Sequence, residues 1–230
     1  MKFFHKISIA LIGAVAISAI AQPTPVFAIS AQVPISSVVA ATKAEDFLIL
    51  GEEEYDKGDY QGAIAAYTQA LVLNPNYADA YNGRGNARCR LGDNKGAVAD
   101  FNEAVRINPN FAEAYTCRGN ARDDLGDSQG ALADYDRALQ INPNFASAYL
   151  NRGVTRSRLG DKQSAVADYN AALRINPNLA GAYLSRGLAR AEGGDKPGAI
   201  QDFQKAADLF QQQGDRDNYQ KAINNMRKLQ

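Results

Sequence analysis

The sequence predicts an all-α solenoid built from repeated helix-turn-helix units. Three observations lead to this prediction: the chain matches itself when it is displaced by 34 residues, Gly and Pro recur at even spacing, and Ala is abundant while Trp is absent. Short repeated helices suit these observations better than a large enclosed core does.

Residues 1–28 are expected to be a secretory signal peptide. Lys2 and Lys6 charge the start, and residues 7–21 form an apolar run. The alternative is an uncleaved membrane anchor, although the apolar run is shorter than the ~20 residues that span a bilayer. We therefore expect export across the inner membrane to the periplasm or the exterior, with no membrane insertion after signal cleavage.

The expected cleavage site is Val26-Phe27-Ala28, because a signal peptidase needs small side chains one and three residues before the cut. Ala19-Ile20-Ala21 competes with it. Residues 29–43, with Pro34 and Ser36-Ser37, show no period and are expected to be a flexible lead-in.

The charge of the predicted mature chain excludes a general affinity for nucleic acid. Removing residues 1–28 takes away two of the 25 basic residues and none of the 25 acidic ones, which leaves a net charge of −2. Such a protein has no electrostatic attraction to nucleic acid or anionic lipid. The only histidine, His5, leaves with the signal, and with it the usual general base and commonest metal ligand.

Residues 44–213 divide into five units, each predicted to form two helices. Small Gly and Ala let the two helices approach closely, while Tyr and Phe fill the gap between them. The units are 44–77, 78–111, 112–145, 146–179 and 180–213, and the residues that recur between them include Phe47, Gly51, Ala63, Tyr67, Ala70 and, through the fourth unit, Pro75.

Turn residues separate the predicted helices. Gly58-Asp59 and its four copies supply a residue that tolerates a left-handed helix end, followed by a carboxylate that caps the next helix. Pro197 follows the last of these turns, in a first-turn position where its missing N–H costs nothing. The Asn-Pro-Asn triplets at 74–76, 108–110, 142–144 and 176–178 end the second helix of each unit.

This pattern resembles the tetratricopeptide repeat, whose aromatic, Gly, Ala and Pro positions match in all five units except for the last Pro. The resemblance implies a right-handed α-solenoid and a concave groove, lined by the first helix of each pair, that binds peptides. One subclass grips a C-terminal carboxylate with Lys, Asn and Arg. Here only Asn86, Asn120 and Asn151 match, while the cationic positions are Ser147, Gly181 and Ser185, so this function is not expected.

Residues 214–230 are predicted to form a capping helix. Tyr219, Ala222, Ile223, Met226 and Leu229 recur at three- and four-residue spacing on an otherwise polar segment. A stacked array exposes an apolar face at its last unit, and a helix of this kind covers it.

Catalytic chemistry is not expected, and neither is a cofactor or a metal site. The mature chain has no histidine for a Ser-His or Cys-His pair, no phosphate loop that ends in Lys-Ser or Lys-Thr, and no close Cys/His cluster for zinc. The adjacent Asp123 and Asp124 point in different directions on a helix. Cys89 and Cys117 are expected to stay unjoined, because their offset along neighbouring helices puts the Cα atoms beyond the ~7 Å that a disulfide bridges.

Arginine precedes the repeat glycine in the second to fifth units, and each of these units has an aspartate in its second helix. The first unit has Leu50 and Ala66 at these positions, so both partners are present or absent together. This favours structural ion pairs over a phosphate or RNA site. The predicted pairs join Arg84, Arg118, Arg152 and Arg186 to Asp100, Asp134, Asp168 and Asp202; further arginines lie one turn later at Arg88, Arg122, Arg156 and Arg190.

The predicted groove is acidic toward its start and apolar toward its end. A covering by the C-terminal helix or by the curvature of the superhelix itself is one explanation for the apolar end, and a pocket for an apolar anchor of a partner is the other. The acidic and polar groove residues are Glu45, Glu52, Asp56, Asp79, Asn82, Asn86, Glu113, Asn120, Asp123 and Asp124, and the apolar ones are Leu150, Val154, Leu184 and Leu188.

These observations predict a non-catalytic scaffold or assembly factor that binds a protein or peptide segment. The alternative is an accessory or targeting subunit of a separate envelope enzyme, which requires a partner chain. The oligomeric state stays open.

Overall fold

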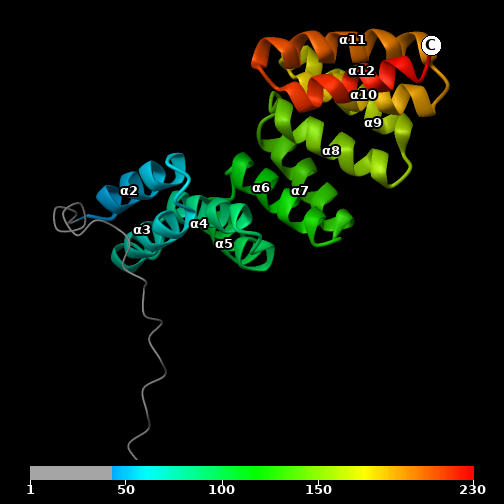
Figure 1. The fold of residues 1–230 in the computed structure, drawn as a ribbon. Helices are drawn as coiled ribbons and strands as arrows, with labels where there is room; N and C mark the ends of the chain where they lie inside the picture. Colours follow the sequence, from blue (N-terminus) through cyan, green and yellow to red (C-terminus); the bar gives the residue numbers. More distant parts are fainter. Residues whose placement is uncertain (1–42) are drawn as a thin grey trace, which may run out of the picture. The chain divides into compact units, whose positions relative to one another are not determined.

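The computed structural model describes residues 43–230, and the predicted signal and nearly all of the predicted lead-in lie outside them. Within this range the chain is all-α (Figure 1). Its helices are α2 (Ala44–Asp56), α3 (Tyr60–Leu73), α4 (Ala78–Arg90), α5 (Asn94–Ile107), α6 (Ala112–Asp124), α7 (Ser128–Ile141), α8 (Ala146–Arg158), α9 (Lys162–Ile175), α10 (Ala180–Glu192), α11 (Lys196–Gln213) and α12 (Arg216–Arg227).

The helices stack in chain order as an α-helical repeat solenoid. Each first helix packs against the second helix of its own unit, as α2 does against α3, and each second helix packs against the next first helix, as α3 does against α4. First helices of neighbouring units also touch, from α2 with α4 to α8 with α10. Every unit therefore contacts mainly its neighbours, which confirms the predicted fold class.

The turn chemistry predicted from the sequence is confirmed. Gly58 has a φ of 83°, in the left-handed region that favours glycine. Asp59 then caps α3 by accepting a hydrogen bond from the Gly62 N–H at 2.9 Å. Between units, extended backbone at Asn74 ends α3, and its Oδ1 accepts from the Asn76 N–H at 3.1 Å.

The core between paired helices is built from small residues and rings, as predicted. A Cβ added at Gly85 would lie 2.7 Å from a ring carbon of Phe101, so only glycine lets the helices pack this closely. Phe101 and Tyr135 are buried, and so are Ala97 and Ala104 on the same face as Phe101. Interiors of this density tolerate little change in volume.

α12 lies against the end of the array. Ala222 is fully buried, and Tyr219 and Ile223 pack with it onto a cluster that includes Leu209 and Phe210 of α11. α11 is 18 residues long and ends at Gly214, where φ is 74°. None of the helices within residues 43–230 combines the length and apolar character needed to cross a membrane.

Candidate functional site

The predicted ion pairs form regular Arg–Asp clusters between the two helices of a unit. Arg84 donates from Nε and Nη2 to the two carboxylate oxygens of Asp100 at 3.0 and 2.7 Å. All four aspartates are buried. The other pairs have the same two-point geometry, with Nη2–Oδ1 distances of 2.5 Å for Arg118–Asp134, 2.6 Å for Arg152–Asp168 and 2.6 Å for Arg186–Asp202.

A second arginine joins each cluster, although the sequence did not assign it a partner. Arg88 lies one helical turn after Arg84, and its Nη1 donates to Asp100 Oδ2 at 2.7 Å. Its recurrence in four units was the signal that it shares the role of the first arginine. The equivalent distances are 2.8 Å for Arg122–Asp134, 2.8 Å for Arg156–Asp168 and 3.0 Å for Arg190–Asp202.

The first arginine of each cluster also binds the preceding unit. Arg84 Nη1 donates to Thr68 Oγ1 of the preceding unit at 3.2 Å. Within its own helix, the Arg84 guanidinium lies 5.4 Å from the centre of the Tyr81 ring. The equivalent acceptors are Asn102 for Arg118, Asp136 for Arg152 and Asn170 for Arg186, at 2.8, 2.6 and 2.6 Å. These guanidinium groups hold neighbouring units together and are not free for a phosphate ligand.

Arg152 shows the electrostatic balance in such a cluster. Its burial lowers the pKa, but hydrogen bonds to Asp168 and Asp136 outweigh burial and raise the pKa above its usual value. The charge is therefore retained inside the protein because it is paired.

One repeat position on the first helices changes in character along the array. It is Glu52 in α2, Asn86 in α4, Asn120 in α6, Val154 in α8 and Leu188 in α10. We call the surface around these five residues the first-helix face. Because first helices of neighbouring units touch, this position recurs from one neighbouring helix to the next and changes from acidic through amide to apolar.

The acidic end of the first-helix face is exposed and unpaired. Glu52 makes no ion pair within residues 43–230, and the same holds for Glu45, Asp56, Asp79, Glu113 and Asp124. Burial and then the charges of Glu45, Asp79 and Glu52 raise the pKa of Tyr77. These three carboxylates therefore act on the same ring hydroxyl from two neighbouring first helices.

Three of the polar residues predicted to line the groove are either buried or hydrogen-bonded within the protein. Asn82 of α4 is buried, with only 7% exposed, so it does not line an open groove as predicted; its Oδ1 has no hydrogen-bond partner among the described residues. Asn120 accepts from Tyr135 Oη and from Asn151 Nδ2 of the next unit, at 2.8 and 2.9 Å. Asn120 stays exposed on α6, its bond to Asn151 links neighbouring first helices, and its place in the groove stays a prediction.

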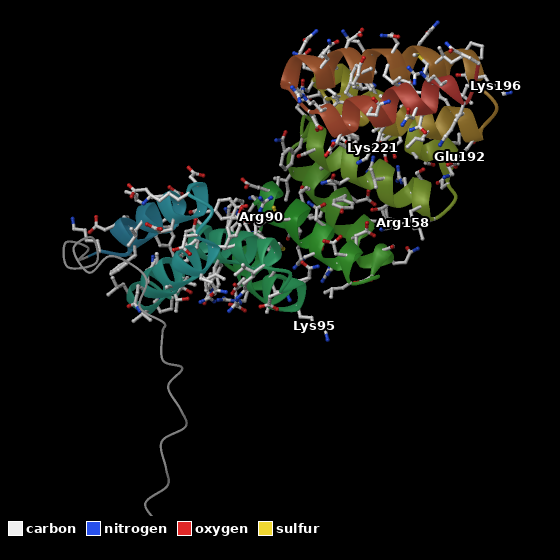
Figure 2. The ribbon with its side chains drawn as sticks, in the orientation of Figure 1. Arg90, Lys95, Arg158, Glu192, Lys196 and Lys221 are labelled. Atoms are coloured by element: carbon white, nitrogen blue, oxygen red, sulfur yellow. The ribbon has the colours of Figure 1, made fainter. Side chains whose placement is uncertain are left out.

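Asp123 is the third of these polar residues. It accepts from Ser128 Oγ at the start of α7 and from Thr155 Oγ1 in the next unit, both at 2.9 Å. Arg158 of the next unit, labelled in Figure 2, also pairs with it. Asp123 thus joins the third and fourth units rather than offering a charge to a partner.

The apolar end of the first-helix face is exposed at two of the four predicted positions. Val154 is 41% and Leu188 is 40% exposed. Leu150 is half-buried against the cluster of Ala165, Tyr169 and Ala189. Leu184 is half-buried against the terminal cluster that includes Ala222 of α12, so the C-terminal helix helps to cover it, as one of the two explanations predicted.

The far end of α4 holds contacts that the sequence did not indicate. Arg90 donates from Nε and Nη2 to Tyr60 Oη at 3.0 and 2.8 Å and lies over its ring.

Cys89 and Cys117 are free thiols, and both pack against the apolar cluster around Phe101. Within residues 43–230 no group of Cys, His, Asp or Glu is arranged to hold a metal ion.

Family comparisons agree with this architecture. A profile described as TPR repeat matches residues 51–92, 85–126 and 119–160, and one described as tetratricopeptide repeat matches 146–179. The chain belongs to the tetratricopeptide repeat family. Proteins of this family are generally non-catalytic and mediate protein–protein interactions. A comparison with curated proteins gave no match.

Solved structures of tetratricopeptide repeat proteins resemble this chain. The MamA protein is 27% identical, with a TM-score of 0.63, over 75% of this chain and 94% of its own. YrrB, described as a TPR protein with an unusual peptide-binding site, is 24% identical, with a TM-score of 0.60, over 79% and 92%. The first TPR of Spaghetti (RPAP3), bound to the HSP90 peptide SRMEEVD, is 30% identical, with a TM-score of 0.50, over 51% and 94%.

Proposed function

We propose that this protein is exported and that its first-helix face holds a segment of a partner polypeptide as a scaffold or assembly factor. The observation that supports this best is the uneven row formed by Glu52, Asn86, Asn120, Val154 and Leu188. Val154 and Leu188 stay exposed on neighbouring first helices, although the fold buries other leucine and valine side chains.

The two ends of the row indicate the chemistry of the partner. Val154 and Leu188 suit an apolar anchor residue, because burial of such anchors supplies most of the binding energy at an interface. The unpaired carboxylates on α2, α4 and α6 suit a basic flank. Such charges speed encounter with the partner more than they tighten the complex.

Peptide binding by similar proteins supports the proposal. Spaghetti (RPAP3) binds an HSP90 peptide, and YrrB is described with a peptide-binding site. Export rests on Lys2, Lys6 and the apolar run that precedes Val26-Phe27-Ala28. Sequencing the N-terminus of the protein recovered outside the cytoplasm should give Ile29, and an uncleaved chain in the membrane fraction would contradict the proposed signal.

Cross-linking followed by capture of the protein from the exported fraction tests the partner site. Val154→Ser with Leu188→Ser should abolish retention of the cross-linked partner while the helical circular dichroism stays unchanged. The matched control is Leu125→Ser with Leu159→Ser, which removes two leucines of similar exposure at helix ends. Retention by the first double variant that equals retention by the control would overturn the proposed site.

A further inference from the structure

A surface site recurs where the loop between two units meets the following unit. It is bounded by the loop proline and asparagine, by the tyrosine of the first helix, and by three residues of the second helix. In the third unit Arg137 occupies it: the guanidinium lies 5.9 Å from the centre of the Tyr115 ring and donates to the Pro109 carbonyl at 3.4 Å.

The second unit fills the equivalent position with an acid. Glu103 takes the place of Arg137, and it accepts from Arg106 Nε at 2.8 Å. Arg106 is the residue three positions further along α5, so the acid and its cation come from the same helix. In the third unit a long side chain of the protein itself occupies the site, and in the second unit the acid at the same repeat position pairs with the cation of its own helix.

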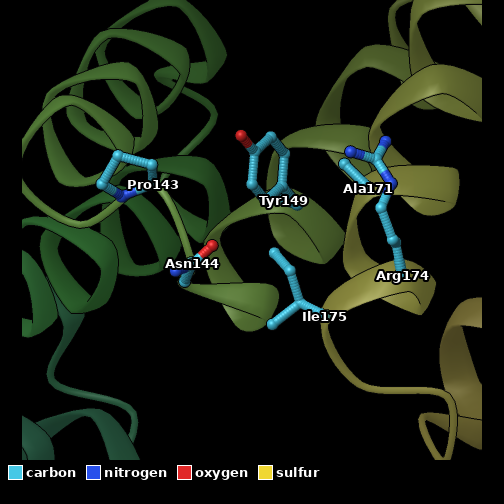
Figure 3. A pocket seen from close by; sticks show the side chains of 6 residues that line it. All are labelled: Pro143, Asn144, Tyr149, Ala171, Arg174 and Ile175. Atoms are coloured by element: carbon cyan, nitrogen blue, oxygen red, sulfur yellow. The ribbon is translucent and has the colours of Figure 1, made fainter.

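The fourth unit leaves the site open. Ala171 stands where Glu103 and Arg137 stand in the earlier units, and it lines a pocket of about 440 Å³. Figure 3 shows the Tyr149 ring and the Arg174 side chain on opposite sides of this space, with Ile175 below them. Pro143 and Asn144 complete the lining.

The charge at this pocket is positive and unmatched. Arg174 is exposed, and it makes no ion pair or side-chain hydrogen bond within residues 43–230, whereas Arg106 at the same repeat position has Glu103. Arg152 lies 5.3 Å from the centre of the Tyr149 ring, but its donors are used by Asp168 and Asp136. A cationic side chain that entered as Arg137 does would meet Arg174 instead of the neutral Gln140.

We infer that this pocket receives a glutamate side chain of a partner protein, with an apolar residue beside it. The carboxylate takes the place that Glu103 holds in the second unit and pairs with Arg174, for which guanidinium geometry allows two hydrogen bonds. The Tyr149 ring, Pro143 and Ile175 contact the apolar neighbour. The site uses α9, a loop between units and Tyr149 of α8, and none of the five residues that define the first-helix face, so it does not depend on the proposed function.

The test is a titration of the isotope-labelled full chain, followed by NMR, with three blocked tripeptides. Ac-Leu-Glu-Leu-NH2 should shift the amide signals of Ala171, Arg174 and Ile175 in a saturable way, with a dissociation constant on the order of 1–10 mM. Ac-Leu-Gln-Leu-NH2 should bind at least about fivefold more weakly, and Ac-Leu-Lys-Leu-NH2 more weakly still, because both lack the charge that matches Arg174.

Two variants locate the binding. Arg174→Gln removes the cation, and Ala171→Glu supplies the acid from within the chain as Glu103 does, so each should abolish the shifts without loss of thermal stability. Ala167→Glu, an exposed change on the same helix, is the control and should leave the shifts intact. The inference is overturned if no saturable shift occurs at these residues, if the glutamine or lysine peptide binds as well as the glutamate peptide, or if Ala167→Glu removes binding equally.

Discussion

The first unit and the second unit have the same pair of helices but hold them together differently. Leu50 packs in the buried core of the first unit beside Ala66, whereas Arg84 and Asp100 occupy these positions in the second. The backbone thus accepts either an apolar or an ionic contact. The arginine has one further role, because it also reaches the second helix of the preceding unit.

This difference follows from position in the array. Within residues 43–230 no second helix precedes α2, so an arginine at position 50 would lack the acceptor that Thr68 gives to Arg84. An arginine with unused donors in a buried site costs more than a leucine does. The clusters therefore connect units as well as closing each one.

Removing the aspartate of an inner cluster should have the largest effect. Asp134→Ala leaves Arg118 and Arg122 without their shared carboxylate, and we expect the free energy of unfolding to fall by about 3 kcal/mol or more. Urea unfolding followed by circular dichroism measures the change. Glu113→Ala, at an exposed acid without an ion pair, should cost under about 1 kcal/mol. Equal, small losses for both variants would mean that the cluster contributes little to stability.

Introducing an arginine into the first unit should lower the free energy of unfolding somewhat less than Asp134→Ala does. Leu50→Arg alone buries a guanidinium without an aspartate at position 66, with only the buried Glu54 one helical turn away, and should cost about 2–3 kcal/mol. Adding Ala66→Asp supplies its partner and should recover at least about 1 kcal/mol, measured as the coupling energy of a double-mutant cycle. A coupling near zero would show that the second arginine or the preceding unit, rather than the pair itself, makes the clusters stable.

The sequence contained the signal for the Arg–Asp pairs because arginine and aspartate appear and disappear in the same units. It also contained the turns, because glycine, aspartate and proline act on their own backbone. The contacts that Asn120 and Asp123 make with the next unit were missed, since their partners Asn151 and Thr155 are more than 30 residues away and no local pattern marks these contacts. Which residues of the first-helix face stay exposed depends on neighbouring helices in the same way, as Leu184 beside α12 shows.

The helix caps should behave alike in both kinds of unit. Asp59 in the first unit and Asp127 in the third accept from the backbone N–H three residues later at 2.9 Å. Replacing either by Ala should cost about 1 kcal/mol in urea unfolding. A loss confined to one of them would show that the units differ in their turns as well as in their interhelical contacts.

The smallest expected effect concerns the two cysteines. Cys89 in the second unit takes the repeat position of Tyr55 in the first unit, and Cys117 in the third unit takes that of Ile49. Burial raises the pKa of Cys89 to about 11 and that of Cys117 to about 12. Because the thiolate is the reactive form, iodoacetamide should modify both slowly at pH 8 in the folded protein.

The reaction rate should rise about tenfold per pH unit between pH 8 and 10, since the thiolate fraction does so below the pKa. The raised pKa also means that the thiol form favours the folded state, so this contribution to stability is present below about pH 9 and is lost as the pH rises toward 11 to 12. Mass spectrometry after unfolding without reductant should find both thiols alkylated. Rapid modification of folded protein at pH 8 would show that the cluster around Phe101 opens far more readily than its packing indicates. If mass spectrometry finds no free thiols in the monomer, the two cysteines are joined.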